Sequence, residues 1–202
     1  MKSLIENFLQ NKNFYLSLVG EHLFITMVAI TIAIIVGVAV GVVISEKRKI
    51  AGIVISIVNV LYTIPSIALL GVLISVTGIG NKTAIIALTL YALLPVVRST
   101  YTGIVNIDEK IVEASEAMGS TKFQTMYKVK LPLAFPVIFS AIRNMVTMTI
   151  ALAGIASFVG AGGLGVAIYR GITTNNANLL LIGSILIALL ALVSDGLLGI
   201  VQ

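Results

Sequence analysis

Residues 113–132 read EASEAMGSTKFQTMYKVKLP and make up the one long polar, charged stretch in an otherwise mostly apolar chain. The charged residues in it are Glu113, Glu116, Lys122, Lys128 and Lys130. The runs on both sides are apolar and long enough to cross a bilayer, for which a helix needs about 20 residues. The chain is therefore expected to leave the membrane here, form a hydrophilic element in water, and return.

The local sequence predicts that this element begins with a short helix. Asp108 and Glu109 are suited to cap its first turn, because acidic side chains complement the positive end of the helix dipole. The helix would run through Met118 and end at Gly119, since glycine adopts the left-handed conformation that closes a helix.

A second helix is expected directly afterwards. Ser120 or Thr121 can cap its start, and Pro132 is expected to limit how far it runs before the membrane. We call residues 106–132 the elbow. The alternative is an ordinary loop that carries two amphipathic helices.

Composition places the rest of the chain in a membrane. Of the 202 residues, 58% are hydrophobic and 10% are charged, whereas soluble domains carry about 25% charged residues. The net charge of +5 does not indicate nucleic acid, because the basic residues lie at the ends of apolar runs. There is no cysteine, so no disulfide is available. We predict an all-α integral membrane protein with five transmembrane helices, over residues 23–45, 51–77, 83–105 and 133–159, with the fifth beginning over residues 179–193 and Asp195 near its end.

Basic residues predict the orientation of these helices. Seven lie on the side of the elbow, namely Lys47, Arg48, Lys49, Lys110, Lys122, Lys128 and Lys130. Four lie on the other side, namely Lys2, Lys12, Lys82 and Arg170. The positive-inside rule then places the elbow in the cytoplasm, the N-terminus outside and the C-terminus inside. Residues 1–21 have helical apolar spacing and are expected to form an amphipathic helix on the outer surface. An unstructured tail over residues 1–13 is the alternative.

Proline interrupts the second span at Tyr62-Thr63-Ile64-Pro65-Ser66. Such a proline kinks or breaks a helix, and the freed carbonyl must face protein or water. The region is therefore either a lining of a pathway or a structural kink only. Our candidates for a translocation pathway or gate are Tyr62, Pro65, Ser66, Tyr91, Pro95, Asn144, Thr147 and Met148.

Charged residues within the spans form a second group of candidates. Arg98, Arg143 and Asp195 are all expected near the inner side, where they would form a charge network with a structural or gating role. Asp108 and Glu109 are further possible partners of Arg98.

The remaining motifs do not predict a cofactor, catalytic or metal site. Residues 160–165 match G-x-G-x-x-G, but no strand precedes them and no acid follows at the expected distance, so a tight turn is predicted instead of a dinucleotide site. His22, the one histidine, is expected to be interfacial. Without a cysteine or a second histidine, neither a catalytic site nor a metal site is expected. No phosphate-binding G-x-x-x-x-G-K-[ST] loop is present.

The elbow resembles the EAA loop of ABC-importer permeases, whose pattern is E-A-A, three residues, Gly, nine residues, then I-x-L-P. Glu113, Ala114, Gly119, Leu131 and Pro132 fall on this pattern, while Ser115 and Val129 replace Ala and Ile. The resemblance implies a permease of the type I importer (MetI-like) fold whose cytoplasmic coupling helix sits in a groove of an ATPase subunit. The residues implied in coupling are Glu113, Ala114, Ser115, Met118, Gly119, Leu131 and Pro132.

The wider chain is similar to the permeases of osmoprotectant uptake, through residues 62–71, 94–103 and 160–165. The resemblance implies transport of glycine betaine, carnitine or choline across a bacterial plasma membrane. It implies a homodimer, two cytoplasmic ATPase subunits that bind ATP and Mg, no cofactor in this chain, and an external binding protein or a binding domain fused after residue 202. Residues 1–202 would then be one permease domain.

Alternatives remain at this point. An importer of this type could carry another small zwitterion, such as a methionine-like amino acid or a trimethylated histidine derivative. An ion-coupled carrier or channel would need ionisable groups across the bilayer midplane and usually a repeated architecture, and the sequence has neither.

Overall fold

A computed structural model describes residues 2–201, with the side chains of Lys2 and Ser3 left out. Every regular element in this range is helical. The helices are α1 (Lys2–Gln10), α2 (Lys12–Glu46), α3 (Arg48–Thr63), α4 (Ser66–Thr77), α5 (Asn81–Val105), α6 (Glu109–Ala117), α7 (Lys122–Thr125), the π-helical turn η1 (Met126–Lys130), α8 (Leu131–Leu152), the 3₁₀ turn η2 (Ala153–Val159), α9 (Gly165–Thr173) and α10 (Ala177–Val201).

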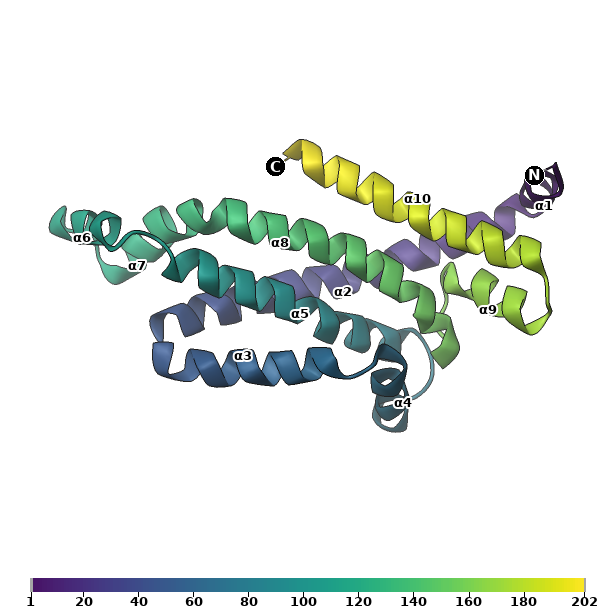
Figure 1. The fold of residues 1–202 in the computed structure, drawn as a ribbon, viewed down its shortest axis with the longest axis horizontal. Helices are drawn as coiled ribbons and strands as arrows, with labels where there is room; N and C mark the ends of the chain where they lie inside the picture. The colour runs from purple at the N-terminus through teal and green to yellow at the C-terminus, as the bar shows by residue number, and fades with distance from the viewer. Residues whose placement is uncertain (1, 202) are drawn as a thin grey trace.

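The long helices form an elongated bundle (Figure 1). Four helical segments are long and apolar enough to span a membrane, namely Lys12–Glu46, Asn81–Val105, Lys122–Val159 and Ala177–Val201. The pair α3 and α4 supplies a fifth span if it is counted as one broken helix. The predicted all-helical membrane fold is confirmed. We call the end that carries α6 and α7 the elbow end and the opposite end, with α4 and α9, the far end.

The centre of the bundle is the contact between α2 and α5, where glycines let the two helices approach closely. A Cβ atom added to Gly37 would lie 2.8 Å from the side chain of Val96, and one added to Gly41 would lie 2.5 Å from Thr100. Small residues four apart permit such approach between membrane helices. The small-residue pair visible in the sequence therefore packs α2 against α5.

The second predicted span is broken at Pro65. Helices α3 and α4 meet at an angle of 99°, so α3 alone runs along the bundle and α4 turns aside at the far end (Figure 1). Proline lacks the N–H that would continue the helical ladder, and Ile64 and Pro65 take extended backbone angles.

The first helix boundary differs from the one predicted. Residues 1–21 were expected to form one surface helix, but α1 ends at Gln10 and the following residues belong to α2. Tyr15 explains the difference: its fully buried ring stacks on Phe8 and its hydroxyl donates to Asn7 Oδ1. The fifth span, predicted to begin over residues 179–193 with Asp195 near its end, corresponds to α10, which starts at Ala177 and extends past Asp195 to Val201.

Candidate functional site

The first arm of the elbow is α6, and both of its ends are closed by local hydrogen bonds. The Asp108 carboxylate accepts a bond from the Lys110 backbone N–H at 3.0 Å. At the other end Gly119 has φ of +87°, its N–H donates to Glu116 O, and Ser120 N–H donates to Ser115 O. This pair of bonds is the Schellman closure of a helix. The predicted cap at Asp108 and stop at Gly119 are confirmed.

The second arm begins at the predicted cap but does not end where expected. Thr121 and Gln124 form a reciprocal capping box, which satisfies donors at the start of a helix. From there the chain stays helical through η1 into α8, so the prediction that Pro132 ends this arm is wrong. The Leu131 N–H bonds to Met126 O, five residues back. We attribute the tolerance of Pro132 to this wider π turn, since a proline ring clashes with the carbonyl four residues earlier in a regular α-helix.

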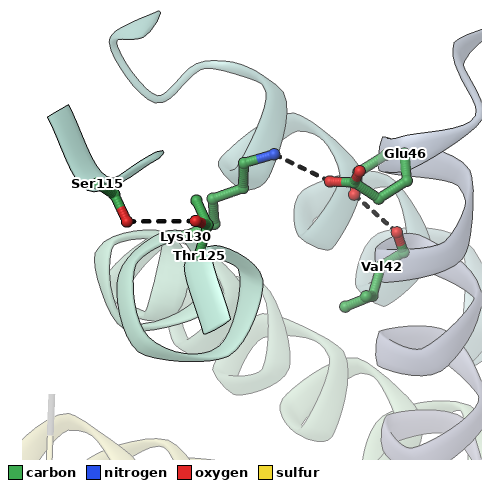
Figure 2. Close-up of polar contacts among 6 residues, drawn as sticks. Val42, Glu46, Ser115, Thr125 and Lys130 are labelled. Atoms are coloured by element: carbon green, nitrogen blue, oxygen red, sulfur yellow. Dashed lines mark hydrogen bonds and ion pairs between the residues drawn. The ribbon is translucent and has the colours of Figure 1, made fainter. Parts of the chain in front are cut away.

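Two contacts fix the elbow in place, and Figure 2 shows both. The Ser115 and Thr125 hydroxyls are buried and lie 3.2 Å apart, which ties the first arm to the second. The Lys130 ammonium lies 2.9 Å from Glu46 Oε1 at the end of α2. Below them Met126 is buried with Ile104, Ala134 and Ile138. The elbow is therefore a packed unit and not a loose loop.

The outer surface of the elbow is unusually apolar for a polar segment. Met118 is 87% exposed, Phe123 70% and Tyr127 52%. The Phe123 and Tyr127 ring centroids are 4.4 Å apart, and Glu113 and Ala114 are exposed as well. Clustered apolar groups exposed to water mark sites of association. Our sequence reasoning missed this aromatic pair, although its i, i+4 spacing in a helical segment was a usable signal.

A groove runs along the bundle between α5 and α8, on the side away from α2. Its lining residues are Ser99, Pro136, Val137, Ser140, Ala141 and Asn144. Helix α5 lies between α3 and α8 (Figure 1). Polar side chains thus line an open surface within segments that otherwise expose mainly apolar residues.

Aromatic residues gather at the Pro65 break, towards the far end. The Tyr91 hydroxyl donates to the carbonyl of Ile64, which satisfies a backbone acceptor next to the break. The Tyr62 and Tyr91 rings meet edge to face, with centroids 5.9 Å apart. The Tyr62 hydroxyl reaches Met148 Sδ of α8 at 3.5 Å. The break is therefore held by contacts from α5 and α8.

The structure brings together several of the predicted pathway residues. Tyr62, Tyr91 and Met148 touch one another as described, and Ser66 lines a small apolar pocket together with Tyr91. Asn144 lies in the groove, and Pro95 lies one turn from Tyr91 on α5. Thr147 bonds to the Arg143 carbonyl of its own helix and, within residues 2–201, makes no hydrogen bond with the aromatic cluster.

The predicted charge network of Arg98, Arg143 and Asp195 forms only in part, because Arg143 pairs with Asp195 and Arg98 does not join them. The Arg143 guanidinium donates two bonds to the Asp195 carboxylate, at 2.6 and 2.7 Å, and Gly199 leaves room for it. Arg98 does not join them and has no ion pair with Asp108 or Glu109 in residues 2–201. The physical reason is position: Asp195 lies on α10, whose main neighbours in the bundle are α8 and α9.

The glycine-rich stretch forms the predicted turn and covers His22. Gly163 N–H donates to Glu21 Oε2 at 3.0 Å and Gly162 N–H to Asn81 Oδ1 at 2.9 Å. His22 is only 1% exposed, and its Nε2 lies 3.0 Å from Ile150 O. The turn packs directly over the His22 ring, so His22 is enclosed by protein, and its position at the membrane interface stays a prediction. In the described part of the chain no group of three His, Cys, Asp or Glu residues could hold a metal ion.

Comparison with known proteins adds the following. The family described as "Binding-protein-dependent transport system inner membrane component" matches residues 22–202. The carnitine transport permease protein OpuCD of Listeria monocytogenes is 40% identical over 203 residues, covering 100% of this chain and 91% of the relative. The glycine betaine/carnitine/choline transport system permease protein OpuCD of Bacillus subtilis (strain 168) is 41% identical over 191 residues, covering 94% and 83%. A chain of the MetNI methionine ABC transporter in inward-facing conformations is 28% identical, with a TM-score of 0.81 over 93% of this chain and 96% of that one.

Proposed function

The chain belongs to the family of inner membrane components of binding-protein-dependent transport systems, and we propose that it carries quaternary amines into the cell. It is a permease subunit of an ABC transporter. The substrates proposed are carnitine, glycine betaine and choline, which the names of its relatives contain. It lies in the bacterial plasma membrane, with the elbow in the cytoplasm and the N-terminus outside.

The observation that carries the coupling mechanism is the exposed apolar tip of a rigid elbow. Met118, Phe123 and Tyr127 offer a surface to a neighbouring protein, and we assign that neighbour as the ATPase subunit. Because the second arm continues into α8 without a break, a push on the tip is transmitted along α8. Movement of α8 then opens or closes the groove that it lines.

The roles in the elbow follow from the same geometry. Glu113 and Ala114 are exposed on α6 and contact the ATPase, whereas Ser115 holds the arms together from inside. Gly119 makes the turn between the arms, and Leu131 and Pro132 join the elbow to the membrane helix.

The complete transporter contains two copies of this chain, two ATPase subunits and an external binding protein or a fused binding domain. ATP and Mg bind to the ATPase subunits. The groove and the aromatic cluster of each copy face the pathway between the copies, because the unpartnered polar groups that line them are costly against lipid.

Uptake by reconstituted vesicles tests the proposal. The chain is purified with its ATPase subunit, reconstituted together with the binding protein, and supplied with labelled carnitine, glycine betaine, choline, methionine and a trimethylated histidine. Accumulation of methylated amines that requires ATP is expected. Uptake of methionine alone would show that the substrate is wrong and leave the transporter in place. Failure to transport any of them, or to retain an ATPase subunit on purification, would contradict the proposal.

A further inference from the structure

Arg98 is a charged residue of the membrane bundle that has no role in the proposed coupling mechanism. It lies on α5 about 10 Å from the elbow end, seven residues before Val105 at 1.5 Å per residue. Its side chain is exposed and makes no hydrogen bond or ion pair with residues 2–201. Arg143, in contrast, is matched by Asp195. An arginine within a membrane segment is costly unless it faces water or a partner, so Arg98 is expected to face either a water-filled space or a partner from outside the chain.

The position of Arg98 on α5 shows which surface it faces. Tyr91, Pro95, Arg98 and Thr102 fall within about 60° of one another around the helix axis, at 100° per residue. Tyr91 contacts Tyr62 of α3, and Ser99 lines the groove with α8. On the opposite side Val96 is buried against Gly37 of α2. Arg98 therefore opens between α3 and α8, beside the groove.

The direction of the side chain brings Arg98 closer to the aromatic cluster. Side chains of an α-helix tilt towards its N-terminus, which for α5 is the far end where Tyr62 and Tyr91 lie. Tyr62 is 37% exposed and Met148 36%, so both can be reached from the open side. Arg98 thus lies on the same side of α5 as Tyr91, about two helical turns away along the helix, and Tyr91 contacts the exposed ring of Tyr62.

Two amide side chains lie on α3 and α8, the helices that flank this surface. Asn144 lines the groove, and Asn59 lies one turn before Tyr62 on α3. Neither amide side chain makes a hydrogen bond in the described part of the chain. Unpaired amides within a membrane segment point to water or to a polar ligand.

We infer that this surface is a transient binding site for a zwitterion, with Arg98 binding its carboxylate and Tyr62 facing its quaternary ammonium. This inference rests on the proposed function, because it places the proposed substrate in the groove. Guanidinium and carboxylate form strong charge-assisted hydrogen bonds, and a tyrosine face attracts a quaternary ammonium. The free charge of Arg98 repels a bare cation, so the site prefers carnitine and glycine betaine over choline.

A cysteine probe tests the site directly, because the chain contains no cysteine. Asn144→Cys is introduced into the full transporter in vesicles, and its labelling by a small maleimide is timed with and without millimolar carnitine. Carnitine is expected to slow labelling by about threefold or more, as a charge-assisted contact allows. Choline is expected to slow it less. Lys49→Cys, exposed at the start of α3 and outside the groove, is the control whose labelling carnitine should leave unchanged.

Variants of Arg98 and Tyr62, each combined with Asn144→Cys, test the proposed contacts with the carboxylate and with the quaternary ammonium separately. Arg98→Gln is expected to abolish protection by carnitine, and Arg98→Lys to retain part of it. Tyr62→Leu should weaken protection, whereas Tyr62→Phe, which keeps the aromatic face, should not. Absence of protection in the Asn144→Cys protein, or equal protection with Arg98→Gln, would overturn the site. Since labelling requires neither ATP nor uptake, that failure is distinct from a failure of the proposed function, which the uptake assay decides.

Discussion

The chain turns sharply at two places, Gly119 in the elbow and Pro65 between α3 and α4, and holds the two turns by different means. At the elbow the closing contacts are local: Ser120 to Ser115, Thr121 to Gln124, and Ser115 to Thr125, ten residues apart. At Pro65 they are distant: Tyr91 bonds to Ile64 across 27 residues and Tyr62 to Met148 across 86.

The difference shows which turn can move as a body and which must change its contacts. A turn closed within ten residues keeps its shape when the helices around it shift, so the elbow can transmit a push. A turn held by α5 and α8 depends on where those helices lie. If α8 moves relative to α3, the contact between Tyr62 and Met148 must change. The contrast supports the proposed role of the elbow as a unit that transmits a push, and it identifies the Pro65 break as the turn whose contacts would change.

The largest expected effect comes from Gly119→Val, which strains the backbone of the turn in the elbow. The backbone at Gly119 has φ of +87°, and no atom lies within 4 Å of an added Cβ. Strain and not a clash therefore opposes the substitution, by about 1–2 kcal/mol or more for a branched residue. We expect the elbow to open and ATP-driven uptake to fall more than about tenfold, measured in vesicles with ATP hydrolysis followed in parallel.

The matched variant is Gly119→Asn, because asparagine tolerates the left-handed conformation. It should insert and transport nearly as well as the parent protein. Equal loss in both variants would mean that the space around Gly119, and not the shape of the turn, matters to the ATPase subunit.

A smaller effect is expected from Tyr91→Phe at the Pro65 break. Removing the hydroxyl leaves the Ile64 carbonyl without its bond, which costs about 1–3 kcal/mol when the acceptor is buried. Tyr62→Phe is the control: its hydroxyl meets only a thioether, a weak acceptor. Thermal unfolding of the purified transporter should show a clear loss for the first variant and little for the second. A larger loss for Tyr62→Phe would show that the contact with α8, and not that with α5, holds the break.

The same contrast explains what the sequence could predict. The caps at Asp108 and Thr121 and the stop at Gly119 depend on neighbours in the chain, so residue types and spacing were sufficient. The proline at position 65 predicted a break, but neither its 99° angle nor the Tyr91 bond follows from local sequence. Pro132 was misjudged because a π turn, which has no simple sequence signal, accommodates it.

Long-range partners were the hardest to predict. Asp195 could have paired with Arg98 or Arg143, and only the packing of α10 on α8 selects Arg143. His22 was expected at the interface because it begins an apolar run, yet the turn at Gly163, far along the chain, covers it. In both cases the residue type could be interpreted from the sequence, but the residue that it contacts in the fold could not be predicted.

The smallest expected effect concerns the ion pair between Lys130 and Glu46, which joins the elbow to α2 across 84 residues. The two side chains are 21% and 45% exposed, and exposed pairs contribute only about 0.2–1 kcal/mol. A double-mutant cycle of Lys130→Met and Glu46→Gln, measured by unfolding of the transporter, should give a coupling within this range. The coupling should shrink as salt is raised, because salt screens exposed charges. A coupling above about 2 kcal/mol, beyond the range for exposed pairs, would mean that α2 holds the elbow in shape, and the elbow would then not be closed by its local contacts alone.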